Sequence, residues 1–221
     1  MKRFVFFVLI ILIALLSLSG CGLTYKDDKS LPNTSKGVVF SDDFSDPESG
    51  WDRFQNETGA TDYTNAGYMI FIKKENFIKW SNLSRVVPAD LRIEVDVSKQ
   101  YGADDNAYGV LCRYQDPENF YYFLISSDGF GGIGRREDGQ LKIISSTDGK
   151  LEPISSINQG DASNHLRVDC VGDNLTMYVN GNQVLQVTDG TFSSGSIGLV
   201  SRTYDIGGTG ILFSQLAVLK P

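Results

Sequence analysis

Histidine is nearly missing from this sequence, because only His165 carries an imidazole among 221 residues. A single histidine excludes the HExxH zinc site and every multi-histidine metal cluster. A Ser-His-Asp triad would have to use His165. That residue lies on the polar side of an alternating segment, with no nucleophile-elbow motif nearby. We therefore interpret His165 as a surface residue and predict no metal site built on histidine.

Basic residues are also scarce, with 20 Lys and Arg against 27 Asp and Glu and a formal net charge of −7. Lys2 and Arg3 belong to an N-terminal leader, so without it 18 basic residues face 27 acidic ones, a net charge of −9. An acidic surface repels phosphate backbones. Nucleic acid is thus excluded as an expected partner.

Helical patterning is absent after the leader, where no segment of ten or more residues repeats its apolar residues with a helical period. The apolar residues alternate instead. Leu166, Val168 and Cys170 are separated by polar residues, and the segment 91–97 shows the same period of two. This period is typical of strands with one buried face.

Glycine-containing turns separate these strands. Asn180-Gly181 suits a type I′ hairpin turn, since both residues tolerate positive φ, and residues 172–174 predict a second hairpin. The pattern predicts strands over 38–40, 67–73, 77–80, 91–97, 107–114, 120–126, 132–136, 141–145, 165–171, 175–179, 182–187, 196–201 and 211–219. About a dozen short strands with such turns favour an all-β sandwich of two antiparallel sheets, or a jelly roll.

The first 20 residues read as an export signal. Lys2 and Arg3 precede an unbroken apolar run from Phe4 to Leu16, which is short for a transmembrane span, the alternative interpretation. The ending Leu18-Ser19-Gly20-Cys21 resembles the lipobox of bacterial lipoproteins. The resemblance implies cleavage before Cys21 and lipid on its thiol and amine, which would anchor the protein on a membrane without spanning it. Gly22 is not a retention aspartate, so an outer membrane is the expected address in a cell that has one.

Residues 21–37 are polar and without period, and we predict a lipidated cysteine followed by a tether. Residues 38–221 form the expected domain. Its segments 42–51, 108–133 and 164–200 resemble concanavalin A-like, laminin-G-like jelly-roll domains of bacterial surface proteins. The Val179-Asn180-Gly181 hairpin followed by D-x5-G-x-I-G-L carries most of the resemblance. It implies two curved antiparallel sheets, in a family that includes lectins, glycan-binding modules, glycosidases and interaction domains.

Two features bear on calcium. Similar domains often hold a structural calcium ion with an acidic residue in the last strand, but residues 213–216 here read FSQL, without a carboxylate. The acid pairs Asp42-Asp43 and Asp104-Asp105 could supply oxygen ligands, although solvated acids are common in turns. We expect no cofactor and no such calcium ion.

A partial catalytic motif lies in the segment 94–99. Jelly-roll glucanases carry E-x-D-x-x-E on one strand, with nucleophile, helper and acid on one face. Glu94 and Asp96 match, but Lys99 stands at the position of the acid. A lysine does not replace a carboxylic acid that protonates a leaving group. We interpret the two acids as a solvated strand face, so the expected protein is not an enzyme of this type.

Two cysteines remain after Cys21. Cys112 and Cys170 both alternate with apolar residues, which predicts that they face the core. An exported protein meets an oxidising environment. A Cys112–Cys170 disulfide and two separate buried thiols are both compatible with the sequence.

Aromatic residues gather in the middle strands together with arginines: Trp80, Tyr101, Tyr108, Tyr114, Tyr121, Tyr122, Arg113, Arg135 and Arg136. Sugar rings stack on exposed aromatic faces, and arginine can bond their hydroxyls. Most of these rings could equally belong to the core. We predict that Arg113 faces solvent opposite Cys112 and binds ligand, together with Tyr122, Trp80 and Arg136. Residues 129–134 (GFGGIG) lack the lysine and helix of a phosphate loop, so we expect a hairpin turn there.

These observations predict a lipid-anchored binding module of the bacterial cell envelope, facing outside the cytoplasm. Its expected partners are the membrane, through the lipid, and a carbohydrate or a surface protein. Two alternatives stay open. One is a hydrolase of modified disaccharides with the same fold, and the other is a structural subunit of an envelope complex.

Overall fold

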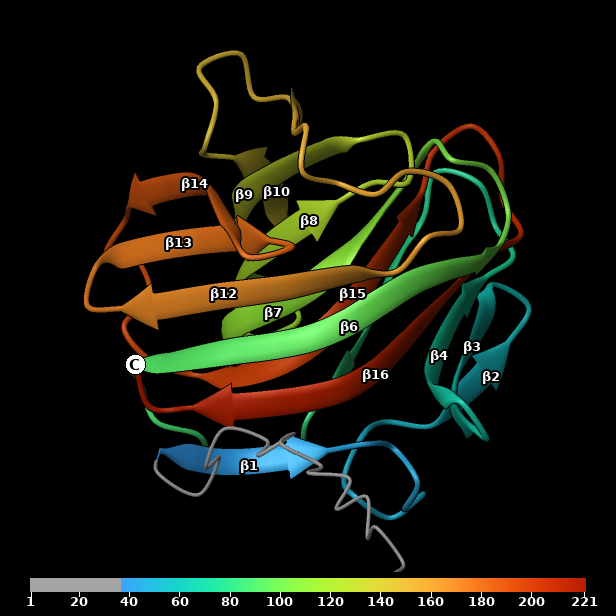
Figure 1. The fold of residues 1–221 in the computed structure, drawn as a ribbon, viewed down its shortest axis with the longest axis horizontal. Helices are drawn as coiled ribbons and strands as arrows, with labels where there is room; N and C mark the ends of the chain where they lie inside the picture. Colours follow the sequence, from blue (N-terminus) through green and yellow to red (C-terminus); the bar gives the residue numbers. More distant parts are fainter. Residues whose placement is uncertain (1–36) are drawn as a thin grey trace, which may run out of the picture. The chain divides into compact units, whose positions relative to one another are not determined.

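The computed structural model describes residues 37–221, which form strands in two stacked antiparallel sheets (Figure 1). The predicted signal peptide, Cys21 and nearly all of the tether lie outside the described residues. Within residues 37–221, no helix is long and apolar enough to cross a membrane.

The first sheet has nine strands. Eight follow the order β14-β13-β12-β6-β16-β4-β3-β2, and β1 pairs with β16 beside them. Their bounds are β1 (Val38–Asp42), β2 (Phe54–Asn56), β3 (Gly59–Thr64), β4 (Gly67–Ile72), β6 (Leu91–Tyr101), β12 (Asn164–Val171), β13 (Asn174–Val179), β14 (Asn182–Thr188) and β16 (Thr209–Leu219).

The second sheet has seven strands. Six follow the order β10-β9-β8-β7-β15-β5, and β11 pairs with β9. Their bounds are β5 (Ile78–Asn82), β7 (Asn106–Asp116), β8 (Asn119–Ile125), β9 (Phe130–Glu137), β10 (Gln140–Ile143), β11 (Glu152–Pro153) and β15 (Ser196–Thr203). The two sheets lie one behind the other in Figure 1, with β6 and β12 in front of β7 and β8.

The core fills the space between the sheets, and its side chains follow the alternation expected from the sequence. Leu166, Val168 and Cys170 of β12 are fully buried, and β6 alternates buried and half-buried residues from Leu91 to Val97. The all-β two-sheet sandwich predicted from the sequence is confirmed. Apolar burial of this kind contributes about 25 cal/mol for each Å² removed from water, and it holds the two layers together.

The two hairpins predicted around residues 172–174 and at Asn180-Gly181 are confirmed, whereas three strands were missed. Val179 pairs with Asn182 across Asn180 and Gly181, which have φ values of 52° and 82°, as a type I′ turn requires. Strands β2, β3 and β11 escaped prediction because they are short or polar and lie at sheet margins, where few apolar residues mark them.

Candidate functional site

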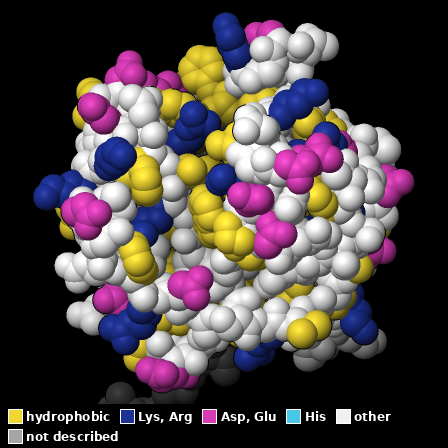
Figure 2. Space-filling view, turned by 180° about the vertical axis from the view of Figure 1, so that it is seen from behind, with side chains coloured by type: hydrophobic (Ala, Val, Ile, Leu, Met, Phe, Trp, Pro, Cys, Tyr) yellow, Lys and Arg dark blue, Asp and Glu magenta, His cyan; other side chains and the backbone are white. Residues whose placement is uncertain are grey.

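A groove of about 500 Å³ lies on the outer face of the seven-stranded sheet, the face turned away from the core. Strands β7, β8, β9, β10 and β15 and the segment 149–151 contribute its lining. The lining includes Asp105, Tyr122, Asp128, Phe130, Arg202 and Tyr204. Figure 2 shows this side of the molecule, where apolar side chains gather in a hollow bordered by charged ones.

The floor of the groove follows from alternation along β8. Tyr121 and Phe123 point into the main core, whereas Tyr122 and Leu124 belong to a second apolar cluster on the outer face. Most of the 129–134 segment continues this floor, because β9 begins at Phe130. The predicted hairpin turn is therefore wrong except at Gly129, whose φ is 95°. Gly134 of β9 leaves room for the Tyr122 ring, and Gly131 and Gly132 leave room for aliphatic side chains.

Two tyrosines and one arginine give the groove its chemistry. Burial, as the largest cause, raises the pKa of both Tyr122 and Tyr204. Both hydroxyls therefore stay protonated at neutral pH and can donate hydrogen bonds. The guanidinium carbon of Arg202 lies 4.7 Å from the centroid of the Tyr204 ring. Arg202 and Tyr204 thus form a cation–π pair that offers both donors and an apolar face.

Carboxylates border one end of the groove. Asp105 precedes β7, and Asp128 lies in the turn between β8 and β9. Burial first, and then the negative charges of Asp128 and Asp205, raise the pKa of Asp105 above its ordinary value of 3.8. Asn106 fixes this end, because its side chain accepts from the backbone N–H of Ser127 at 3.1 Å. The acids can accept hydrogen bonds from ligand hydroxyl groups.

A cluster of three rings continues the same outer face. We call this cluster, Trp80, Tyr114 and Phe120, the aromatic shelf. The Trp80 and Phe120 centroids are 5.4 Å apart, and Tyr114 stacks on Phe120 at 5.6 Å. The guanidinium carbon of Arg136 lies 5.5 Å from the Trp80 centroid. Three of the four predicted ligand residues, Trp80, Tyr122 and Arg136, therefore share one face. Their role in binding stays a prediction.

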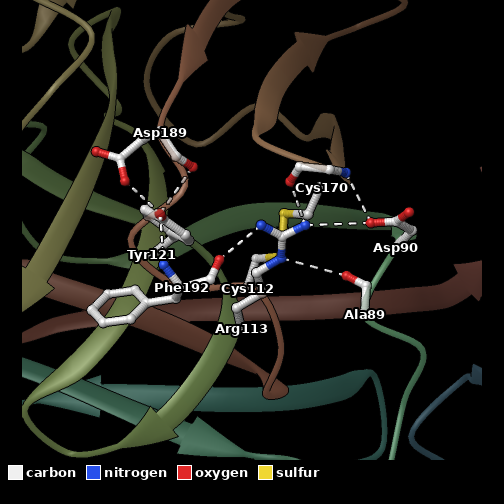
Figure 3. Close-up of a disulfide and its surroundings, with 9 residues drawn as sticks. Ala89, Asp90, Cys112, Arg113, Tyr121, Cys170, Asp189 and Phe192 are labelled. Atoms are coloured by element: carbon white, nitrogen blue, oxygen red, sulfur yellow. Dashed lines mark hydrogen bonds and ion pairs between the residues drawn. A yellow bond between two sulfur atoms is a disulfide. The ribbon is translucent and has the colours of Figure 1, made fainter.

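Arg113, the fourth, does not face solvent, and this prediction is wrong (Figure 3). Its side chain is only 2% exposed. It donates to the carbonyl oxygens of Phe192 at 2.8 Å, Gly172 at 2.6 Å and Ala89 at 3.4 Å, and it reaches Asp90 Oδ1 at 3.4 Å. Arg113 therefore ties three loop segments to the end of the sandwich instead of meeting a ligand.

A β-bulge causes this reversal. Gly198 of β15 pairs with Leu111 of β7, and Ser196 pairs with Tyr114. One residue separates the two partners on β15 and two residues separate them on β7, so β7 holds one extra residue. Arg113 takes up the extra residue with a φ of 52°. The bulge turns its side chain away from the direction that strict alternation predicts. Single-sequence reasoning had no signal for it.

Cys112 and Cys170 form a disulfide beside the Arg113 side chain, as Figure 3 shows. The bond ties β7 of one sheet to β12 of the other, across 58 residues of sequence. Of the two interpretations that the sequence left open, the disulfide is the one found. Structural disulfides are typical of oxidising compartments outside the cytoplasm.

Sequence reasoning missed Arg202, Tyr204 and Asp128 as residues of the groove. Arg202 follows the buried run of β15, and Tyr204 lies just beyond the end of that strand, so no alternating pattern marks them. Only the pairing of β15 between β5 and β7 brings them to the groove. The sequence marks Asp105 only as a turn acid that could supply an oxygen ligand to calcium, not as a residue of this groove.

The partial glucanase motif lies on the outer face of the other sheet. Glu94 and Asp96 flank His165, whose Nδ1 is 2.7 Å from Asp96 Oδ1 and whose Nε2 is 3.8 Å from Glu94 Oε2. Lys99 lies on the opposite side of β6, 7% exposed, and pairs with Asp104 and Asp161. Paired-carboxylate catalysis requires its acidic side chains on one face of the strand. The three motif positions do not share a face.

Metal-ligand chemistry is equally sparse in the described part of the chain, where no three His, Cys, Asp or Glu residues are placed to hold an ion. Asp42 is engaged by protein donors, since its Oδ2 accepts from Trp51 Nε1 at 3.0 Å and Ser49 Oγ at 2.5 Å. The absence of calcium remains an expectation.

No protein-family model matches the chain, and no curated protein matches it in sequence. Solved structures do resemble it. The carbohydrate-binding module CBM66 from Bacillus subtilis has a TM-score of 0.62 at 19% identity, covering 78% of this chain and 96% of that one. A β-glucanase from Bacillus licheniformis has a TM-score of 0.60 at 9% identity, covering 85% and 99%. A galectin-like protein of unknown function from Bacillus subtilis scores 0.59 at 9%, covering 83% and 96%.

At such identities the likenesses show the fold alone. The chain is a concanavalin A-like, galectin-like jelly-roll sandwich, as the sequence resemblance implied. That architecture is shared by carbohydrate-binding modules and glycoside hydrolases, so the fold does not select between binding and cleavage.

Proposed function

We propose that this protein is a non-catalytic carbohydrate-binding module, held on the outside of the cell membrane by lipid on Cys21. The observation that supports this most directly is the groove on the seven-stranded sheet. It combines apolar rings with hydroxyl, guanidinium and carboxylate groups within about 500 Å³, the mixture that sugar rings and their hydroxyls require.

Each part of the groove has a distinct task in this proposal. The half-buried ring of Tyr204 packs against the C–H face of a sugar ring, above a floor that includes the buried ring of Tyr122. Arg202 donates to ring or hydroxyl oxygens, and Asp105 and Asp128 accept from sugar hydroxyls. The floor comes from strands rather than loops, so little side-chain or backbone ordering is needed on binding.

The disulfide supports a place outside the cytoplasm for the domain. Lipid on Cys21 remains a proposal from the lipobox alone. Growth with a radiolabelled fatty acid would test it directly. The full chain should incorporate label, whereas Cys21→Ser should not. Equal labelling of both proteins would overturn the proposed anchor.

Hydrolysis is the second candidate, because a β-glucanase shares the fold. The arrangement of Glu94, Asp96 and Lys99 argues against the glucanase mechanism. Turnover assays on neutral and acidic polysaccharides should show no product. Turnover that Glu94→Gln abolishes would replace the binding proposal with an enzymatic one.

Ligand screening with a site-specific signal tests the binding proposal. The chain has two tryptophans, the half-buried Trp80 on the outer face and Trp51, which is 4% exposed in the core. Their indole N–H groups give two NMR signals. A glycan that binds on the seven-stranded sheet should shift the Trp80 signal and leave that of Trp51 unchanged. No binding across a broad glycan panel, or a shift confined to Trp51, would overturn the proposal.

A further inference from the structure

A second hollow lies where the edges of the two sheets meet. Strand β2 ends the nine-stranded path and β5 ends the seven-stranded one. Two adjoining cavities of about 230 and 360 Å³ lie between them, and both are lined by Phe54, Lys79 and Trp80. We call the two cavities together the edge hollow.

Lys79 is the unusual member of this hollow. It is only 9% exposed, and its Nζ lies 3.8 Å from the centroid of the Phe54 ring. Among residues 37–221, no carboxylate lies within 4.0 Å of Nζ and no hydrogen-bond acceptor engages it. Asp52 also lines the hollow, but its Oδ2 accepts from the backbone N–H of Asn82 at 3.2 Å.

Lys99, the other buried lysine of the described residues, differs from Lys79 in having carboxylate partners. Lys99 is similarly buried, at 7% exposure, yet it pairs with Asp104 at 3.1 Å and with Asp161. Burial lowers the pKa of Lys79, with no opposing charge to restore it. A buried cation that meets an aromatic ring but no carboxylate is only partly compensated for its lost hydration. In a chain with more acids than bases, a partner would have been easy to supply.

A second such cation lies on the aromatic shelf. The guanidinium of Arg136 rests over Trp80 and Phe120, and its buried Nε has no hydrogen-bond partner in the described residues. Trp80 therefore borders the edge hollow and also lies beneath Arg136. Ile78, another residue of the hollow, is the register partner of Arg202 in the groove. The hollow thus adjoins the groove at the edge strand β5, where Lys79 alternates with the outer-face residues Ile78 and Trp80 and meets Phe54 of the other sheet.

We propose that the edge hollow binds an anionic substituent, a carboxylate or a sulfate, of a polysaccharide that also occupies the groove. Lys79 supplies the positive charge, and Phe54 and Trp80 flank the sugar that carries the substituent. Asn56 and Thr58, which also line the hollow, offer hydrogen bonds to its hydroxyls. This inference rests on the proposed function and names the ligand class, an acidic rather than a neutral glycan.

Matched ligands test the charge without altering the protein. Polygalacturonate and its fully methyl-esterified form share a backbone and differ in the carboxylate, and dextran sulfate and dextran differ in the sulfate. Calorimetric titration of the wild-type protein should give at least tenfold tighter binding to one acidic member than to its neutral counterpart. Salt should weaken only the acidic complex. The pair that responds identifies the substituent.

A charge variant then locates the effect. Lys79→Gln should weaken binding of the acidic glycan about tenfold, the scale of one charged hydrogen bond, and leave the neutral glycan unaffected. Lys220→Gln removes the same charge from an exposed residue that follows β16 on the other sheet, and it should change neither affinity. Thermal melts confirm folding of both variants. The matched-ligand comparison stands even where Lys79→Gln does not fold.

The outcomes separate the two proposals. Equal binding of acidic and neutral glycans, or equal effects of Lys79→Gln and Lys220→Gln, would overturn the anionic subsite and leave a neutral-glycan module. Failure of every glycan to bind would overturn the proposed function itself.

Discussion

Gly134 lies directly beneath the ring of Tyr122 on the neighbouring strand. A Cβ atom added at Gly134 would be 2.1 Å from Cζ of Tyr122, far closer than van der Waals contact. The two residues are register partners in β8 and β9. The absence of a side chain at Gly134 therefore sets the position of Tyr122, a central ring of the groove.

Gly134→Ala should displace the Tyr122 ring. We expect a loss of about 1–3 kcal/mol in the free energy of unfolding, the usual cost of overpacking, together with weaker glycan binding. Urea unfolding measures the first effect and calorimetry the second. A double-mutant cycle supplies the control, because Gly134→Ala should cost much less in a Tyr122→Ala background. Additive costs would show that the ring is not what the new methyl group meets.

Arg113 and Arg136 should respond in opposite ways to the same substitution. Arg113→Met removes one buried and two partly buried hydrogen bonds to carbonyl groups, and it should destabilise the fold by about 3 kcal/mol. The affinity of the remaining folded protein for a glycan should be unchanged. Arg136→Met should leave stability nearly intact and weaken binding. Unchanged stability with weaker glycan binding in Arg113→Met would contradict this prediction and would place Arg113 in the ligand site.

The Cys112–Cys170 disulfide should stabilise the sandwich. Closing a loop across 58 residues contributes about 2–4 kcal/mol through restriction of the unfolded chain. Replacing both cysteines by serine should therefore lower the urea midpoint clearly, and reductant should do so in the wild-type protein alone. Intact mass should show no free thiol in residues 37–221. Reductant-independent unfolding would contradict the bond.

Asp105 should oppose folding while it assists binding. Its pKa is raised in the folded protein, so the folded state binds its proton more tightly than the unfolded state does. The favourable contribution is present below about pH 3.8 and is lost as pH rises through the folded pKa. Asp105→Asn should thus raise the melting temperature at pH 7, with the gain vanishing in acid, and should weaken glycan binding. A lower melting temperature at pH 7 would contradict the assignment.

Alternation in the sequence could predict the fold because most strands bury one face only. Leu91 to Val97 and Leu166 to Cys170 therefore carry a clear period of two. The site was harder, because β8 is buried on both faces and its parity becomes visible only when the sheets pack. Arg113 was misplaced by one bulge, which reverses alternation without a local signal.

The groove itself depends on contacts distant in sequence. Asp105 and Tyr122 come together through the pairing of β7 with β8, and Tyr204 joins them because β15 returns to lie between β5 and β7. No single segment contains the site. A sequence pattern could therefore identify aromatic and basic candidates but not the residues that lie beside them in the fold. Trp80, Tyr122 and Arg136 could be proposed from the sequence because large aromatic and basic side chains are conspicuous in short strands, and their binding role stays a prediction.

A pair of tyrosine variants tests the central claim, that the outer face of the seven-stranded sheet binds carbohydrate. Tyr204 lines the groove, whereas Tyr178 is half-buried on the nine-stranded sheet with Arg167 over its ring at 4.2 Å. Affinity for the best glycan from the screen should fall about tenfold or more in Tyr204→Ala and stay at the wild-type value in Tyr178→Ala. Equal affinities in all three proteins, or a loss confined to Tyr178→Ala, would contradict the account.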